Sequence, residues 1–199
     1  AFAGVAAMQP QVEKIVQLVR LMNHQIDTQI SNSSLLVATG ARESVFMGRV
    51  VKEAIAGYPF TDTALAQCVE VSVAADYTFR GSNLLTAQIV TNLLKNALRA
   101  VVATQRDPVP GDVSITVTTS GQTGQLIFAD RGVGMPLAVR ERVFEPFFTT
   151  HESSGHGLGL MFCKQVIQRA GGTIALESQE GAGTRFTVTL PIERKEQSA

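Results

Sequence analysis

Apolar side chains recur at steps of three and four positions from residue 11 to about residue 38, with charged and amide side chains between them. This spacing predicts a helix, because residues three and four apart share one face. A helix of about 28 residues spans roughly 42 Å, and Thr39-Gly40 signals its end. We therefore expect residues 1–40 to form part of a dimerisation hairpin that pairs with a second copy of the chain. The apolar positions are Val12, Ile15, Val16, Val19, Met22, Ile26 and Ile30.

The pattern changes after residue 40, where short helical and alternating segments follow one another. Helical spacing predicts helices at residues 49–56, 86–104 and 160–170. Alternation and turn signals predict strands at 69–74, 76–80, 113–119, 125–129, 173–178 and 184–190. The connections SGQTG and EGAG are typical of hairpins, whereas residues 132–159 are glycine-rich and irregular. Residues 41–199 are thus predicted to be a mixed α+β domain.

The predicted helix at 86–104 carries two different faces. Its apolar positions fall within about 60° of one another on a helix, and its chemically interesting polar positions lie roughly opposite. The apolar set is Val90, Leu94, Ala97 and Val101, and the polar set is Asn92, Asn96 and Arg99. By itself the second face is also compatible with an ordinary solvated surface.

Composition narrows the class of protein. With 199 residues, 45% hydrophobic and 17% charged, the chain can bury a substantial core. A net charge of +0 gives no general attraction to nucleic acid or anionic membrane, so we expect no nucleic-acid partner. Cys68 and Cys163 have no metal-ligand spacing and suit a reducing, cytoplasmic location. Because the chain starts at Ala1 without Met, we expect a fragment whose membrane attachment, if any, lies upstream.

Two glycine-rich segments can carry nucleotide chemistry. Asp130-Arg131-Gly132-Val133-Gly134 follows a predicted strand, where a carboxylate can accept a hydrogen bond from an exocyclic amine beside a closely approaching backbone. Gly155-His156-Gly157-Leu158-Gly159 precedes a predicted helix, whose N-terminal N–H groups can face an anion. A strand-ending turn and a flexible linker would have the same compositions. The second segment is neither a Walker loop nor a dinucleotide fingerprint.

The order of the motifs is more specific than any one of them. The chain carries NLLKNALRA, DRGVGM, FEPFFTT, GHGLGL and GTRFTVTLP in succession. Over about residues 42–192 this resembles the ATP-binding domain of sensor histidine kinases, within the GHKL superfamily. The resemblance implies a two-layer α/β sandwich of the Bergerat type, with a mixed sheet and its helices on one face.

The resemblance also implies roles for particular residues toward ATP and Mg²⁺. Asn96 would hold Mg²⁺ against the phosphates, with Asn92 and Arg99 facing them one turn away. Asp130 would bind the adenine amine, and Gly132 and Gly134 would allow close approach. The remaining implied ligand and lid residues are Phe144, Phe147 and Phe148 of the lid anchor, Gly155, Gly157, Leu158 and Gly159 of the phosphate loop, and Thr184 beneath the adenine.

Two histidines depart from the family pattern. His151 stands where Lys is common and His156 where Thr is common; each can contact phosphate or be a solvated loop residue. We expect the lid, at about residues 136–154, to be mobile without nucleotide. Asn92 stands where ATP-hydrolysing relatives carry a Glu base. Since an amide cannot take a proton at neutral pH, position 92 favours a kinase over an ATPase.

The phosphoacceptor histidine is the missing part. His24-Gln25-Ile26-Asp27-Thr28 has a faint likeness to the family's H-E-x-x-T/N box but lacks its acid. We expect the true acceptor upstream and His24 to be a helix-face residue. The sequence therefore predicts the homodimeric, cytoplasmic kinase core of a two-component sensor, with a response regulator receiver domain as partner. A GHKL ATPase and a nucleotide-binding or dimerisation module with decayed catalysis remain open alternatives.

Overall fold

The computed structural model describes residues 42–150 and 157–193, which belong to one compact unit at residues 41–199. The segment predicted to form the long N-terminal helix lies outside the described residues, as do His24, His151, Gly155 and His156. The predictions made for them therefore stay predictions. Within the described part of the chain, no helix is long and apolar enough to cross a membrane.

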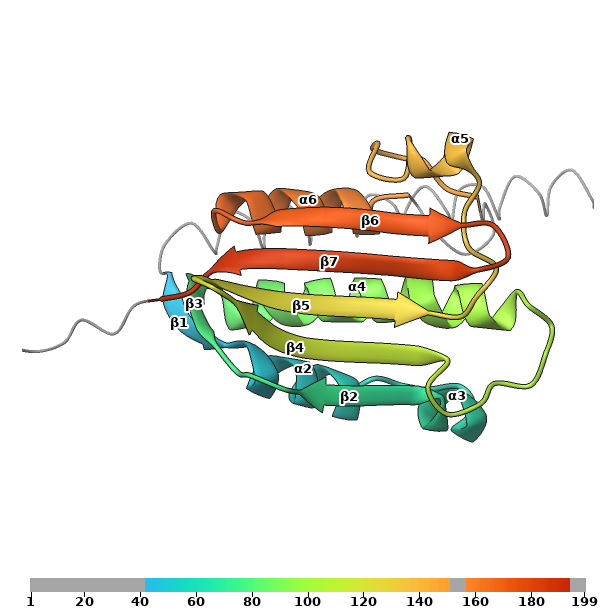
Figure 1. Ribbon diagram of the computed structural model, residues 1–199, viewed down its shortest axis with the longest axis horizontal. Coiled ribbons are helices and arrows are strands. Elements are labelled where there is room, and N and C mark those ends of the chain that lie inside the picture. The colour runs from blue at the N-terminus through green and yellow to red at the C-terminus, as the bar shows by residue number, and fades with distance from the viewer. Residues whose placement is uncertain (1–41, 151–156, 194–199) are drawn as a thin grey trace, which may run out of the picture. The chain divides into compact units, whose positions relative to one another are not determined.

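A five-stranded mixed sheet forms one layer of the unit (Figure 1). Its strand order is β2-β4-β5-β7-β6, with β2 and β4 parallel and the other neighbours antiparallel. The bounds are β2 (Val69–Val73), β4 (Val113–Ser120), β5 (Thr123–Asp130), β6 (Thr173–Gln179) and β7 (Gly183–Pro191). The hairpins β4–β5 and β6–β7 are the two that the turn signals predict.

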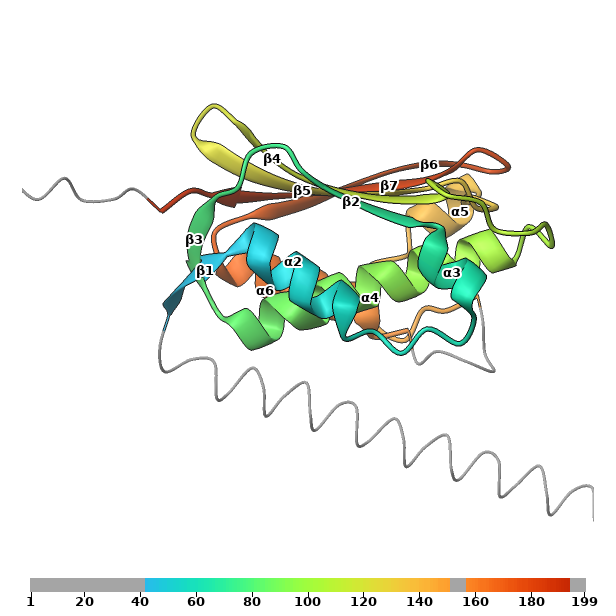
Figure 2. The same ribbon diagram turned by 90° about the horizontal axis from the view of Figure 1, so that it is seen from below.

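Helices form the second layer, and Figure 2 shows them on one side of the sheet only. The three long ones are α2 (Met47–Ala56), α4 (Asn83–Val102) and α6 (Gly159–Arg169). The shorter elements are α3 (Thr63–Gln67), α5 (Leu137–Arg140) and a small antiparallel sheet of β1 (Glu43–Phe46) with β3 (Thr78–Gly81). This architecture confirms the predicted α+β fold class, with a mixed sheet and its helices on one face.

The core lies between the sheet and α4. Along β5 buried residues alternate with partly exposed ones, so that Leu126 and Phe128 face the helices. The apolar stripe predicted for α4 is buried as expected, with Leu94 and Val101 completely inaccessible to solvent. Such alternation is the signature of a sheet packed on one face and open on the other.

Two helices begin earlier than predicted, at hydrogen bonds that the hydrophobic spacing does not indicate. α2 begins at Met47 rather than 49, and the backbone N–H of Gly48 donates to Oδ1 of Asp76 at 2.8 Å. α4 begins at Asn83 rather than 86, because the Ser82 hydroxyl caps the N–H of Leu85 at 3.4 Å. Residues 132–159 are not wholly irregular, since they include the single turn α5.

Candidate functional site

The polar face of α4 is partly exposed, as its position opposite the apolar stripe predicts. Asn92, Asn96 and Arg99 are each half-buried. The Asn92 side chain donates through Nδ2 to the backbone carbonyl of Gly159 at 3.5 Å. This contact brings together two residues that the sequence places 67 positions apart in separate motifs. The contact joins α4 to the first residue of α6.

The thiol of Cys163 lies beside the same contact. Burial raises the pKa of Cys163 to about 12, while a hydrogen bond from Asn92 opposes that rise. The thiol is therefore neutral and unreactive at physiological pH. Its packing between α4 and α6, with Sγ 4.0 Å from the carbonyl oxygen of Ile89, makes it part of the helical layer.

Asp130 ends β5 as a buried carboxylate. Its side chain accepts the backbone N–H of Gly132 through Oδ1 at 2.9 Å. Burial raises the pKa of Asp130 to about 6, and the N–H groups of Gly132 and Thr184 act in the opposite direction. Among the described residues no cation forms a salt bridge with it. Asp130 is thus a hydrogen-bond acceptor held in place by its own loop.

Positions 132 and 134 require glycine, because the backbone there passes very close to other backbone segments. A Cβ on Gly132 would lie 2.5 Å from the carbonyl carbon of Ala100 in α4. Gly134 has φ +66°, and a Cβ there would collide with the carbonyl oxygen of Gln179. The sequence suggests close approach to a flat ring, whereas the observed neighbours are segments of the chain itself.

Thr184 lies directly across from Asp130 in the β5–β7 ladder. Its hydroxyl oxygen is 3.0 Å from Oγ of Ser178, whose hydroxyl also donates to the carbonyl of Gly183 at 2.9 Å. All of these groups are buried. The structure therefore brings the predicted residues Asp130 and Thr184 together and adds Ser178, which the sequence does not single out.

A hollow of about 450 Å³ opens beside this pair. Asp130, Ser178 and Thr184 line it together with Arg140 of α5, which donates to the carbonyl of Ser178 at 2.6 Å. Of the residues that the structure describes, the polar side chains of α4 are not among its walls. Nor do the described residues contain a cluster of three or more His, Cys, Asp or Glu side chains able to hold a metal.

The three lid phenylalanines lie in different surroundings. Phe144 packs edge-on against Phe186 of β7 at 6.4 Å between ring centroids, and Nζ of Lys164 is 5.4 Å from its ring. Phe148 stacks with the Arg142 guanidinium at 4.4 Å. The Phe147 side chain is 62% exposed. Phe144 is thus anchored on the sheet through Phe186, whereas Phe148 contacts Arg142, which is nearby in sequence.

The backbone of Phe147 is nevertheless held. It has φ +64°, and its N–H donates to the carbonyl of Gly157 at 3.1 Å. Gly157 has φ +69°, and a Cβ there would lie 2.5 Å from the carbonyl carbon of Phe147. Leu158 then occupies the N-cap position of α6, where no side chain caps the helix. The segment around Phe147 is therefore joined by a hydrogen bond to Gly157, two residues before α6 begins.

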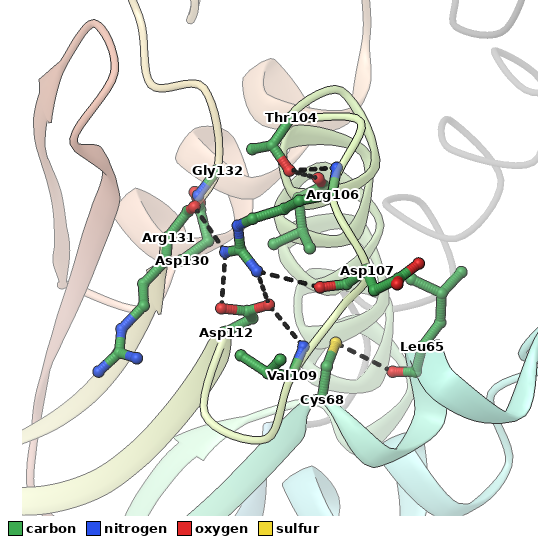
Figure 3. Close-up of polar contacts among 11 residues, drawn as sticks. Leu65, Cys68, Thr104, Arg106, Asp107, Val109, Asp112, Asp130, Arg131 and Gly132 are labelled. Carbon is green, nitrogen blue, oxygen red and sulfur yellow. Dashed lines mark hydrogen bonds and ion pairs between the residues drawn. The ribbon is translucent and has the colours of Figure 1, made fainter.

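Arg106 and Asp112 form an ion pair near Asp130 (Figure 3). The sequence does not predict this pair, because the segment RDPVPGD that contains it indicates only a loop. Arg106 donates to both carboxylate oxygens of Asp112, at 2.6 and 2.7 Å. Arg106 also donates to the carbonyl of Arg131 at 3.3 Å, and the N–H of Arg131 donates to the carbonyl of Asp112 at 2.9 Å. The residue that follows Asp130 is therefore held on both sides.

The pair is ionised under ordinary conditions. The hydrogen bonds from Arg106 hold the pKa of Asp112 below its usual value, although burial acts the other way. Its Oδ2 accepts a further bond from the N–H of Val109 at 2.8 Å. A fully buried carboxylate with these partners fixes the loop between α4 and β4.

The sequence of the chain is similar to one protein family and to several named proteins. Residues 81–194 match the family described as histidine kinase-, DNA gyrase B- and HSP90-like ATPase. The chain is 31% identical over 172 residues to the CAI-1 autoinducer sensor kinase/phosphatase CqsS of Vibrio cholerae, covering 85% of this chain and 24% of that protein. It is 40% identical over 106 residues to sporulation kinase E of Bacillus subtilis, covering 53% of this chain and 13% of that protein.

A solved structure shares the fold as well. The mycobacterial sensor histidine kinase MprB superimposes with a TM-score of 0.62 at 25% identity, covering 77% of this chain and 99% of that one. The chain spans about a quarter or less of the two curated relatives named above.

Proposed function

This chain belongs to the histidine kinase-, DNA gyrase B- and HSP90-like ATPase family, and from that premise we propose that it is the ATP-binding kinase core of a two-component sensor histidine kinase. It transfers the γ-phosphoryl group of ATP to a histidine, which supplies a response regulator. The observation that carries this proposal is the combination of a buried carboxylate acceptor, Asp130, with an amide rather than a carboxylate at Asn92.

The adenine end fits the residues present. Asp130 is buried and ionisable, and one of its oxygens is occupied by the N–H of Gly132. A carboxylate has acceptor capacity for a further donor, and the exocyclic amine of adenine is such a donor. Thr184 stands across the ladder from Asp130, where it supports the same end of the base.

The phosphate end fits in a different way. α6 has eleven residues, and its N-cap Leu158 makes no side-chain hydrogen bond to the helix start. In this proposal the first N–H groups of α6 bind an anion. Gly157, Leu158 and Gly159 lead into that terminus, and Gly155 precedes them. In this proposal Asn96 would supply an amide oxygen as a ligand to Mg²⁺, whose positive charge would offset the negative charge of the phosphates, and Arg99 would face the same negative charge.

The reaction follows from what Asn92 cannot do. Attack by water needs a base, and an amide is not one at neutral pH. A neutral histidine ring nitrogen brings its own lone pair to the γ-phosphorus. The bond from that phosphorus to the β–γ bridging oxygen breaks, ADP leaves with the electron pair, and the ring loses its other proton to solvent.

The partners remain proposals of the same kind. Residues 1–40 pair two chains through a helical bundle, and the phosphoacceptor lies on the part of the hairpin upstream of residue 1. A receiver domain then takes the phosphoryl group from that histidine. The names of the relatives support this reading, since CqsS is a sensor kinase/phosphatase and MprB a sensor histidine kinase.

The test uses the whole chain with γ-labelled ATP and a separately purified hairpin that carries an H-E-x-x-T/N box. We expect the hairpin to be labelled and the chain itself to stay unlabelled, with and without His24→Gln. Self-labelling that disappears in His24→Gln would make His24 the acceptor. Phosphate release without transfer would favour an ATPase, and ATP binding with neither reaction would favour a decayed module. Light scattering should report a dimer.

A further inference from the structure

The hydrogen bonds of the Ser178 hydroxyl determine the direction in which the Thr184 hydroxyl donates its proton. The Ser178 hydroxyl lies 2.9 Å from the carbonyl oxygen of Gly183 and 3.0 Å from the hydroxyl oxygen of Thr184. A carbonyl can only accept, so Ser178 uses its one proton on Gly183. The bond between the two hydroxyls must then be donated by Thr184. Thr184 is left with lone pairs alone for any other partner.

The backbone keeps this arrangement in place. Ser178 and Thr184 are paired in the β6–β7 ladder, and Ser178 accepts a hydrogen bond from Arg140 at its carbonyl, at 2.6 Å. The two hydroxyls are 8% and 5% exposed by residue, so water competes little with their mutual bond. Asp130 is opposite Thr184 in the next ladder, and all three line the same hollow.

We propose that Ser178 is a specificity-determining positioning residue, which fixes Thr184 as an acceptor so that Asp130 and Thr184 together present only acceptors to the base. This inference rests on the proposed function, because it concerns recognition of ATP. A purine with an amino group at its 6-position offers a donor to these acceptors there. A 6-oxo purine places a carbonyl oxygen at the same position, and an acceptor facing that oxygen is left unpaired.

Removing the Ser178 hydroxyl should therefore change selectivity more than affinity. In Ser178→Ala the Thr184 proton is free to turn toward the ligand, and a 6-oxo base is then tolerated. We expect the ratio of ITP to ATP dissociation constants, measured by titration calorimetry on the whole chain, to fall roughly 3- to 10-fold, the range of one ordinary hydrogen bond. ATP affinity itself should change less than this.

Three further variants separate positioning from a purely structural role. Ser178→Thr keeps the hydroxyl and should restore the ratio. Thr184→Val removes the acceptor and should lower the ratio as Ser178→Ala does, and the double variant should add little, since one residue acts through the other. Ser114→Ala is the matched control: its hydroxyl also lies on a carbonyl, that of Ala129 at 3.5 Å, but it should leave the ratio unchanged.

The outcomes are distinct. A parent chain that binds neither nucleotide would refute the proposed function. A parent that prefers ATP, with an unchanged ratio in Ser178→Ala, would overturn this inference alone. If Ser178→Ala does not fold, as circular dichroism would report, Thr184→Val decides the matter: an unchanged ratio there also overturns it.

Discussion

Gly134→Ala tests whether packing within the chain is the reason that glycine is required in the loop after Asp130. Gly134 has φ +66°, and a Cβ there would collide with the backbone carbonyl of Gln179 in β6. Gly121, in the β4–β5 turn, has φ +59°, and a Cβ there would meet nothing within 4 Å. Gly121→Ala is therefore a matched control, which shares the backbone strain but not the collision.

The expected magnitudes follow from these two terms. A non-glycine residue in the left-handed region costs about 1–2 kcal/mol, partly offset by about 0.4–1 kcal/mol from the less flexible unfolded chain. Gly121→Ala should thus lower the free energy of unfolding by about 0–1.6 kcal/mol. Gly134→Ala adds the overpacking penalty of about 1–3 kcal/mol. The obstacle is a backbone carbonyl, which cannot rotate away as a side chain can.

Urea denaturation of the two variants measures this difference directly. In a unit of this size each 1 kcal/mol corresponds to roughly 2–4 °C in melting temperature, so thermal melts give a second reading. Gly134→Ala should also weaken ATP binding, because the loop that carries Asp130 must shift, whereas Gly121→Ala should not. Equal stability of the two variants would show that the close approach to Gln179 is not a constraint.

Three other substitutions follow from the site. Asn96→Ala should abolish Mg²⁺-dependent ATP binding or phosphotransfer. The melting temperature should change little, because truncation of a half-buried side chain leaves no cavity. If calorimetric ATP affinity and phosphotransfer are both unchanged, Asn96 is not part of the site. With the pKa of Asp130 near 6, ATP affinity should fall about fourfold from pH 7.5 to 5.5, and this component should be missing in Asp130→Asn. Arg106→Gln should lower stability at neutral pH, and its difference from the parent should shrink in acid as Asp112 is protonated.

The signs of the two pH effects are opposite. The pKa of Asp130 is raised in the folded chain, so its contribution to stability is present in acid and is lost as pH rises from about 4 to about 6. The pKa of Asp112 is lowered, so its contribution is present above its ordinary value near 3.8 and is lost on acidification. A melting curve followed against pH therefore contains both trends, and Asp130→Asn and Arg106→Gln separate them.

Regular elements were predictable where the pattern is local. The alternation along β4 and β5, with glycine in the turn between them, specifies a hairpin without reference to the rest of the chain. The spacing of Leu94 and Val101 in α4 likewise specifies its buried face. The short helices α3 and α5 have five and four residues, about one helical turn each, so no helical repeat can be recognised in them.

Features that depend on distant partners were not predictable from pattern. The N–H of Gly48 is satisfied by Asp76, which is 28 residues away. Arg106 and Asp112 are only six residues apart, yet a loop sequence does not say that their side chains meet or that Arg106 also reaches the carbonyl of Arg131. Ser178 escaped notice because a serine near the end of a strand is ordinary. In each case the information lies in the tertiary arrangement.

The loop after Asp130, which we propose binds adenine, is held in place by contacts within the chain itself. Gly132 lies against Ala100, and Arg131 is held at its N–H by Asp112 and at its carbonyl by Arg106. The position of the Asp130 carboxylate is consequently fixed by contacts between residues of the chain. Association is weakened when a ligand must order loops and side chains, so a loop ordered during folding improves affinity. The Asp-x-Gly-x-Gly pattern is therefore explained first by packing of the chain against itself, and that packing positions the carboxylate that we propose as the acceptor for adenine.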